Sequence, residues 1–207
     1  MRRKLAGDRR MIIGVTGSFG SGKTTVSGMF GKLGAGVIDA DKTYHLMIKP
    51  GEVLYRKIIK NFGGAVLKKD RTIDRKKLSK IVFEDKAKLA LLNKLAGGEI
   101  IKEMRSRLRS RRGGALIVDA PLLIESGFYR EMDKVVVVRA DKKKQIGRLR
   151  ARGAMSREEA LKRIRTQMPL KEKSSFADFV IDNSGSREKT SRQVKEIWKT
   201  IRGESWR

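Results

Sequence analysis

Short apolar runs alternate with amphipathic stretches along this chain. Five runs are rich in β-branched residues and predict strands at residues 11–16, 36–40, 115–123, 133–140 and 178–183. The unbroken valines of the fourth run are typical of a parallel strand buried on both faces. These runs therefore predict a parallel sheet.

Between the strands, apolar residues recur at helical spacing. The stripes comprise Val26, Met29, Phe30 and Leu33; Ile100, Ile101, Met104 and Leu108; Leu161, Ile164 and Met168; and Val194, Ile197, Trp198 and Ile201. Further helices are predicted over residues 41–48 and 52–62. Asp74 is a predicted N-cap for residues 75–83, and Ser156 with Glu159 forms a predicted capping box for a helix over 156–168.

Alternating strands and helices predict an α/β fold with a parallel sheet and right-handed crossovers. The length of 207 residues predicts one domain. The helical stretch from about 42 to 112 is too long for one crossover, so we expect it to be an inserted subdomain.

Charge changes this picture, because 50 Lys and Arg against 23 Asp and Glu give a net charge of +27. Such a surface attracts polyanions, and non-specific association with nucleic acid would follow, with steep salt dependence. A solvated basic surface is the alternative. The charge is concentrated at residues 142–173, which hold twelve basic and three acidic residues.

Cysteine and long apolar runs are both lacking. The chain has no cysteine, which suits a reducing compartment. No apolar run approaches the ~20 residues that a membrane span requires. We therefore expect a soluble cytoplasmic protein with no membrane partner, and we interpret residues 1–10 as a basic extension. The sequence leaves the oligomeric state of the protein open.

The segment Gly17–Thr24, GSFGSGKT, fits the phosphate-loop pattern G-x-x-x-x-G-K-[ST]. The glycines let consecutive backbone N–H groups face an anion. Lys23 would reach the β- and γ-phosphates, and the Thr24 hydroxyl would hold Mg²⁺. A buried strand before the segment and a helix after it complete the pattern. The sequence therefore predicts binding of a nucleoside triphosphate with Mg²⁺.

Carboxylates follow two of the predicted strands, where ligands of open parallel sheets bind. Asp39 and Asp41 end the second run, and Asp41 is a candidate base for an acceptor hydroxyl. Capping of the next helix is the alternative for Asp41. Asp119 resembles the second metal-side carboxylate of phosphate-loop enzymes. His45, on the same predicted helix face as Asp41, would contact the acceptor or be structural.

Three arginines lie on or just after a predicted helix: Arg148, Arg150 and Arg152. Arginines on a mobile basic segment can neutralise the charge of a transferred phosphoryl group and exclude water. Arg148 and Arg152 share a helix face because they are four residues apart. A solvated basic face accounts for most of the remaining charges.

These segments together resemble the dephospho-CoA kinase family. The resemblance rests on GVTGSFGSGKTTV, VIDAD, DAPLLIESG, QIGRLRARGAMSREEALKRIRTQ, PLKEK and ADFVIDNSGS, in the family's order from about Ile12 to Val194. It implies the phosphate-loop fold of nucleoside-monophosphate kinases, with a five-stranded parallel sheet, a helical CoA-side subdomain at 42–112 and a lid at 141–175. It also implies ATP-dependent phosphorylation of the ribose 3′-hydroxyl of dephospho-CoA, giving CoA and ADP.

The resemblance assigns roles to residues already singled out. Asp41 would be the base, and Arg148 and Arg152 would belong to the lid. ATP would contact Gly20, Ser21, Gly22, Lys23, Thr24, Thr25, Asn183 and Gly185, and the acceptor would contact Asp41, His45 and Leu122. The chain departs from the family at Gly97-Gly98, where His-Pro is usual, and at Ile124, where the family has Phe.

Two alternatives remain at this point. A kinase of the same fold would phosphorylate another nucleotide or nucleoside. A nucleic-acid-binding phosphate-loop ATPase would instead use the basic surface, and hydrolysis of ATP stimulated by DNA or RNA would favour it.

Overall fold

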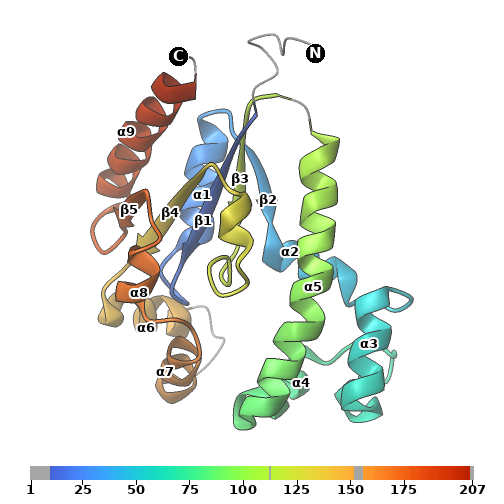
Figure 1. Ribbon diagram of the computed structural model, residues 1–207. Coiled ribbons are helices and arrows are strands. Elements are labelled where there is room, and N and C mark those ends of the chain that lie inside the picture. Colours follow the sequence, from blue (N-terminus) through green and yellow to red (C-terminus); the bar gives the residue numbers. More distant parts are fainter. Residues whose placement is uncertain (1–9, 112, 152–155, 206–207) are drawn as a thin grey trace. The chain divides into compact units, whose positions relative to one another are not determined.

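The computed structural model describes residues 10–111, 113–151 and 156–205 (Figure 1). The chain divides into two compact units. The first contains the chain up to Asp39 and from Leu108 onward, and the second contains Ala40–Arg107. Residues 1–9 of the predicted basic extension lie outside the described residues, as does Arg152.

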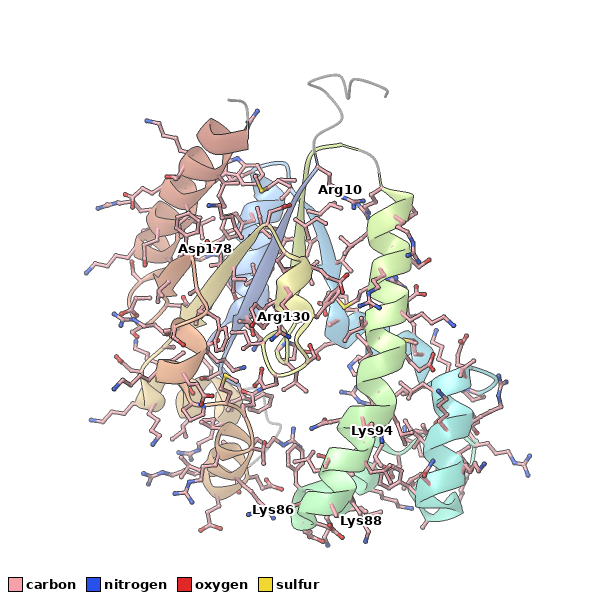
Figure 2. The ribbon with its side chains drawn as sticks, in the orientation of Figure 1. Arg10, Lys86, Lys88, Lys94, Arg130 and Asp178 are labelled. Carbon is pink, nitrogen blue, oxygen red and sulfur yellow. The ribbon has the colours of Figure 1, made fainter. Side chains whose placement is uncertain are left out.

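The first unit is built on a five-stranded sheet in the order β2-β3-β1-β4-β5, with every pair parallel. Its strands are β1 (Met11–Gly17), β2 (Gly36–Asp39), β3 (Ala115–Asp119), β4 (Lys134–Arg139) and β5 (Phe179–Asp182). The predicted parallel five-stranded fold is therefore confirmed. Asp178 joins β5 to β4, because its carboxylate accepts from Val135 N at 2.7 Å (Figure 2).

The third strand ends earlier than predicted, at Asp119 instead of residue 123. Ala120 N still donates to Val15 O at 3.0 Å, but Pro121 has no N–H with which to continue the ladder. The chain then turns, with Ser126 N donating to Leu122 O at 3.0 Å. Leu123 is fully buried, so the apolar character of this segment reflects burial and not strand structure.

Helices cover the sheet of the first unit: α1 (Lys23–Lys32), α6 (Lys142–Ala151), α7 (Arg157–Arg165), α8 (Leu170–Ser174), α9 (Arg187–Ser205) and the short 3-10 helix η3 (Phe128–Glu131). α1 and α9 pack together (Figure 1). Phe30 and Trp198 lie between them with ring centroids 6.1 Å apart. Val26, Val194 and Ile201 are buried with them, as predicted.

The predicted helix over 156–168 is partly wrong. Its capping box is present, with Glu159 N donating to Ser156 Oγ at 3.2 Å and Ser156 N donating to Glu159 Oε2 at 2.7 Å. However, α7 ends at Arg165, and the proline at 169 disfavours helical backbone at Met168, the last residue of the predicted helix. The buried residue of α7 is Ala160, not the predicted apolar stripe.

The second unit consists of helices: α2 (Ala40–Met47), α3 (Val53–Phe62), η2 (Gly64–Val66), α4 (Arg75–Glu84) and α5 (Lys86–Ser110), the last of which continues into the first unit. Leu54, Ile58, Val66, Leu78 and Val82 are buried in a core of its own. Asp74 caps α4 as predicted, accepting from the N–H groups of residues 76 and 77.

α5 runs without a break through Gly97-Gly98. A proline within a helix would remove a hydrogen bond and kink it, and the glycines avoid this. Lys86, Lys88 and Lys94 are exposed along this helix and contribute to the basic surface (Figure 2). No helix in the described part of the chain is long and apolar enough to cross a membrane.

Candidate functional site

The predicted phosphate loop lies between β1 and α1, and its glycines are required by its shape. Gly17, Gly20 and Gly22 have φ angles of 150°, 79° and 93°. A Cβ on Gly22 would lie 2.1 Å from Asn183 Nδ2, and a Cβ on Gly17 would lie 2.1 Å from Val138 O. Side chains at these positions would therefore clash. The ten-residue helix α1 that follows presents its positive N-terminus at the loop.

Lys23 points back into this loop. Its side chain is buried, and its Nζ donates to Gly17 O at 3.2 Å and to Ser18 O at 3.4 Å. The ammonium is thus held by the carbonyls of the loop that would surround a phosphate. Thr24 and Thr25 are exposed in the first turn of α1. Their predicted contacts with ATP and Mg²⁺ stay predictions.

The loop is held from outside by Asn183 and Arg148. Ser21 O accepts from Asn183 Nδ2 at 2.8 Å and from Arg148 Nη1 at 3.1 Å. Arg148 Nη2 donates to Asn183 O at 2.7 Å, and Thr190 Oγ1 donates to Asn183 Oδ1 at 2.9 Å. In a trans peptide the C=O and the next N–H point in opposite directions. The network therefore turns the N–H of Gly22 away from Asn183.

This arrangement adds detail to the predicted roles of two residues. Arg148 was expected to neutralise a transferred phosphoryl group, and here its guanidinium is bound to two main-chain carbonyls of the first unit. Asn183 was expected near the adenine, and its side chain braces the phosphate loop. Gly185 is exposed in the turn between β5 and α9.

Carboxylates end two neighbouring strands. Asp119 is the last residue of β3, is buried, and is paired across the sheet with Val15 of β1 and Asp39 of β2. Val15 lies two residues before the loop begins. Within the described residues no group of three His, Asp or Glu side chains could hold a metal ion alone. One carboxylate and the Thr24 hydroxyl suit Mg²⁺, which takes few protein ligands and completes its shell with phosphate oxygens and water.

Gln167, Glu125 and Lys173 also contribute to this region, and we did not predict roles for them. Gln167 Oε1 accepts from Phe19 N of the phosphate loop at 2.8 Å. Lys173 Nζ lies 2.9 Å from Glu125 Oε1 and donates to Pro121 O at 2.8 Å. Glu125 and Lys173 are 48 positions apart, so no local pattern could predict that they pair. The only signal in the sequence was that they lie in the segments DAPLLIESG and PLKEK, which carry the family resemblance.

Burial sets the protonation behaviour of Lys173, which has no exposed side-chain surface. Removal from water disfavours the ammonium and lowers the pKa of Lys173, whereas the hydrogen bond and charge of Glu125 raise that pKa part of the way back. The carboxylate thus makes burial of this cation tolerable.

The candidate acceptor residues lie in both units. In the second unit, Asp41 is exposed in the first turn of α2, which begins directly after Asp39. His45 is half-buried near Tyr44, with ring centroids 5.8 Å apart. Burial raises the pKa of Tyr44, and the charge of Arg75 lowers it in part. In the first unit, Leu122 is half-buried in the turn after β3.

Comparisons with known proteins agree on one family. A family model described as dephospho-CoA kinase matches residues 11–189. A dephospho-CoA kinase of Carboxydothermus hydrogenoformans is 42% identical over 198 residues, which cover 94% of this chain and 96% of the relative. Among solved structures, TT1252 from Thermus thermophilus has a TM-score of 0.78 at 31% identity, covering 93% of this chain and 98% of that chain.

A second solved structure is a dephospho-CoA kinase from Campylobacter jejuni, with a TM-score of 0.63 at 28% identity. It covers 93% of this chain and 98% of that chain. The matches span the phosphate loop, both strand-end carboxylates and the segment after β4. The predicted phosphate-loop kinase fold is thereby confirmed.

Proposed function

The chain belongs to the dephospho-CoA kinase family, and we propose that it transfers the γ-phosphoryl group of ATP to the ribose 3′-hydroxyl of dephospho-CoA. The products are CoA and ADP, and the reaction is the last step of CoA biosynthesis. The match of the family model to residues 11–189 carries this proposal. The geometry of the phosphate loop supports it, because the loop holds the Lys23 ammonium among its own carbonyls.

Binding of ATP would use the loop from Gly20 to Thr25. Backbone N–H groups and the N-terminus of α1 attract the phosphates. When ATP arrives, its β- and γ-phosphate oxygens would become partners of Lys23 Nζ, which in the structure donates to Gly17 O and Ser18 O. Lys23 would then neutralise charge on the group being transferred. We assign the adenine side to Asn183 and Gly185, at the end of β5.

Mg²⁺ would be held by the Thr24 hydroxyl and, through water, by the Asp119 carboxylate. When bound with ATP, this ion neutralises phosphate charge and favours departure of ADP. Asp119 suits this role because it is buried at the end of β3, next to the strand that leads into the loop. Arg148 and Arg152 would add positive charge on the lid side.

Asp41 would act as the general base on the acceptor. Its carboxylate accepts the proton of the 3′-hydroxyl while that oxygen forms a bond to the γ-phosphorus. The bond between this phosphorus and the β,γ-bridging oxygen breaks, and ADP leaves with the electron pair. His45 and Leu122 would contact the acceptor. We place the reaction in the cytoplasm, which the absence of cysteine suits.

Acceptor specificity tests this proposal. Purified protein is incubated with Mg-ATP and either dephospho-CoA, AMP, GMP or shikimate, and ADP release is followed by a coupled assay. We expect turnover with dephospho-CoA alone. Turnover of another acceptor instead would favour a different kinase of the same fold. ADP release that requires DNA or RNA would favour the nucleic-acid-dependent ATPase.

A further inference from the structure

Phe19 of the phosphate loop is contacted by the end of α7 and by the residues that follow this helix. Gln167 Oε1 accepts a hydrogen bond from Phe19 N at 2.8 Å. The guanidinium of Arg163, one helical turn earlier, lies 5.6 Å from the centroid of the Phe19 ring, within the range of a cation–π contact. The end of α7 is therefore attached to the loop by a main-chain and a side-chain contact.

The hydrogen bond of Gln167 fixes one particular peptide plane, between Ser18 and Phe19. Because this peptide's N–H and C=O point in opposite directions, holding Phe19 N from outside aims Ser18 O toward the inside of the loop. Ser18 O accepts from Lys23 Nζ at 3.4 Å and from Ser21 N at 3.0 Å. Gln167 is thus connected to the Lys23 ammonium through a single peptide group.

Gln167 is itself held next to a rigid point. Met168 N, the next amide along the chain, donates to Glu125 Oε1 at 3.2 Å. The same oxygen lies 2.9 Å from Nζ of the fully buried Lys173, which also donates to Pro121 O at 2.8 Å. Pro121 follows Asp119 by two residues. The segment is therefore fastened to the end of β3 at the position from which Gln167 reaches the loop.

We propose that Gln167 is a positioning residue for phosphoryl transfer, which sets the Ser18–Phe19 peptide and thereby the place of the Lys23 ammonium. The proposal rests on the proposed function for its kinetic consequence. Asn183 and Arg148 hold the loop at Ser21 O. Gln167 supplies a second support at Phe19 N, so that the loop is shaped before ATP binds.

Two variants of Gln167 and one neighbouring control test this role. Gln167→Met keeps the length of the side chain and removes the acceptor, whereas Gln167→Glu keeps an acceptor oxygen. Thr166→Ala is the control, because Thr166 Oγ1 donates to Arg163 O at 2.8 Å at the end of the same helix. The measurements are hydrogen exchange of the Phe19 amide, Kd for Mg-ATP, kcat at saturating ATP, and Tm.

For Gln167→Met we expect faster exchange of the Phe19 amide and a kcat about three- to tenfold lower, the equivalent of one lost hydrogen bond. Kd for Mg-ATP should rise by a similar factor, with Tm unchanged. Gln167→Glu should recover the slow exchange and most of kcat at saturating ATP, and Thr166→Ala should match the wild type in all four measurements.

Unchanged exchange in Gln167→Met would overturn the proposal, and so would a normal kcat and Kd alongside lost protection. A Gln167→Glu variant as slow as Gln167→Met would also overturn it. Wild-type protein that forms no CoA would instead refute the proposed function. In that case the exchange rates and the Kd for Mg-ATP would still decide the role of Gln167.

Discussion

Replacing Glu125 by alanine would leave the buried ammonium of Lys173 without its carboxylate. In the folded protein Lys173 Nζ lies 2.9 Å from Glu125 Oε1, and the Lys173 side chain has no exposed surface. Its hydrogen bond to Pro121 O, at 2.8 Å, would remain. Met168 N would lose its acceptor as well. The variant therefore loses both the negative charge that offsets the Lys173 ammonium and the acceptor of the Met168 N–H.

The expected cost follows from the burial of the pair. Removing one partner of a buried ion pair costs about 3–5 kcal/mol. The Glu125 side chain keeps 22% of its surface exposed, so water can partly solvate the ammonium, and we expect about 3 kcal/mol. For a chain of this size that corresponds to a Tm lower by roughly 6–12 °C.

The deficit should also depend on pH. Burial lowers the pKa of Lys173 in the folded state, and Glu125 raises it part of the way back. In the variant this folded-state pKa lies lower still. As pH rises from the folded-state pKa toward the ordinary value, the unfolded chain binds more protons than the folded one, so the free energy of unfolding increases. Because the folded-state pKa of Lys173 is lower in the variant, the free energy of unfolding increases more in the variant than in the wild type. The difference in Tm between the two proteins should therefore narrow from pH 7 to pH 9.5.

Tryptophan fluorescence during thermal unfolding is the appropriate assay, because Trp198 packs against Phe30 in the core of the first unit. Glu103→Ala is the matched control. It removes the i,i+4 ion pair with Arg107, whose side chains are 39% and 38% exposed, and it should change stability by only about 0.5 kcal/mol. A Glu125→Ala variant with the Tm of this control, or with a Tm deficit that does not narrow at high pH, would show that Glu125 does not compensate a buried Lys173 ammonium.

The remaining predictions concern catalysis. Lys23→Ala should abolish turnover, because the γ-phosphate loses its charge partner; steady-state turnover near the wild-type rate would contradict this. Asp41→Asn should lower kcat by roughly 10²–10⁴-fold with Mg-ATP affinity retained, the range for losing a general base, and a near-normal kcat would remove Asp41 from that role. Arg148→Ala should lower kcat more than ATP affinity, as measured by kcat against Kd. An effect on ATP affinity alone would show that Arg148 contributes to binding, through its contacts with Ser21 O and Asn183 O, and not to phosphoryl transfer.

Local patterns predicted much of this molecule. The glycines and lysine of the loop, the strand before it and the helix after it occupy a few consecutive residues, so their geometry could be inferred from spacing. The position of Asp119 at a strand end followed in the same way. The Asp74 cap and the Ser156–Glu159 capping box are also local hydrogen-bonding patterns, and both are present.

Contacts between distant segments could not be predicted. Leu123 is buried outside any strand, so its apolar character misled the prediction of where β3 ends. Gln167 reaches Phe19 across 148 positions, and no periodicity marks such a contact. The bracing of Ser21 O by Asn183 likewise depends on β5 lying beside β4, with the turn after β5 brought to the loop. These contacts shape the site, and only the folded chain shows them.

The identity of the phosphorylated product decides whether this chain phosphorylates dephospho-CoA at its ribose 3′-hydroxyl. Wild-type protein is incubated with Mg-ATP and dephospho-CoA, and the product is analysed by ³¹P NMR and mass spectrometry, with Lys23→Ala in parallel. We expect a single new phosphomonoester on the ribose 3′-oxygen, formed in equal amount to ADP, and none with the variant. Phosphate released to water in place of that ester would show that dephospho-CoA is not the acceptor. An ester formed equally by Lys23→Ala would show that Lys23 takes no part in the transfer.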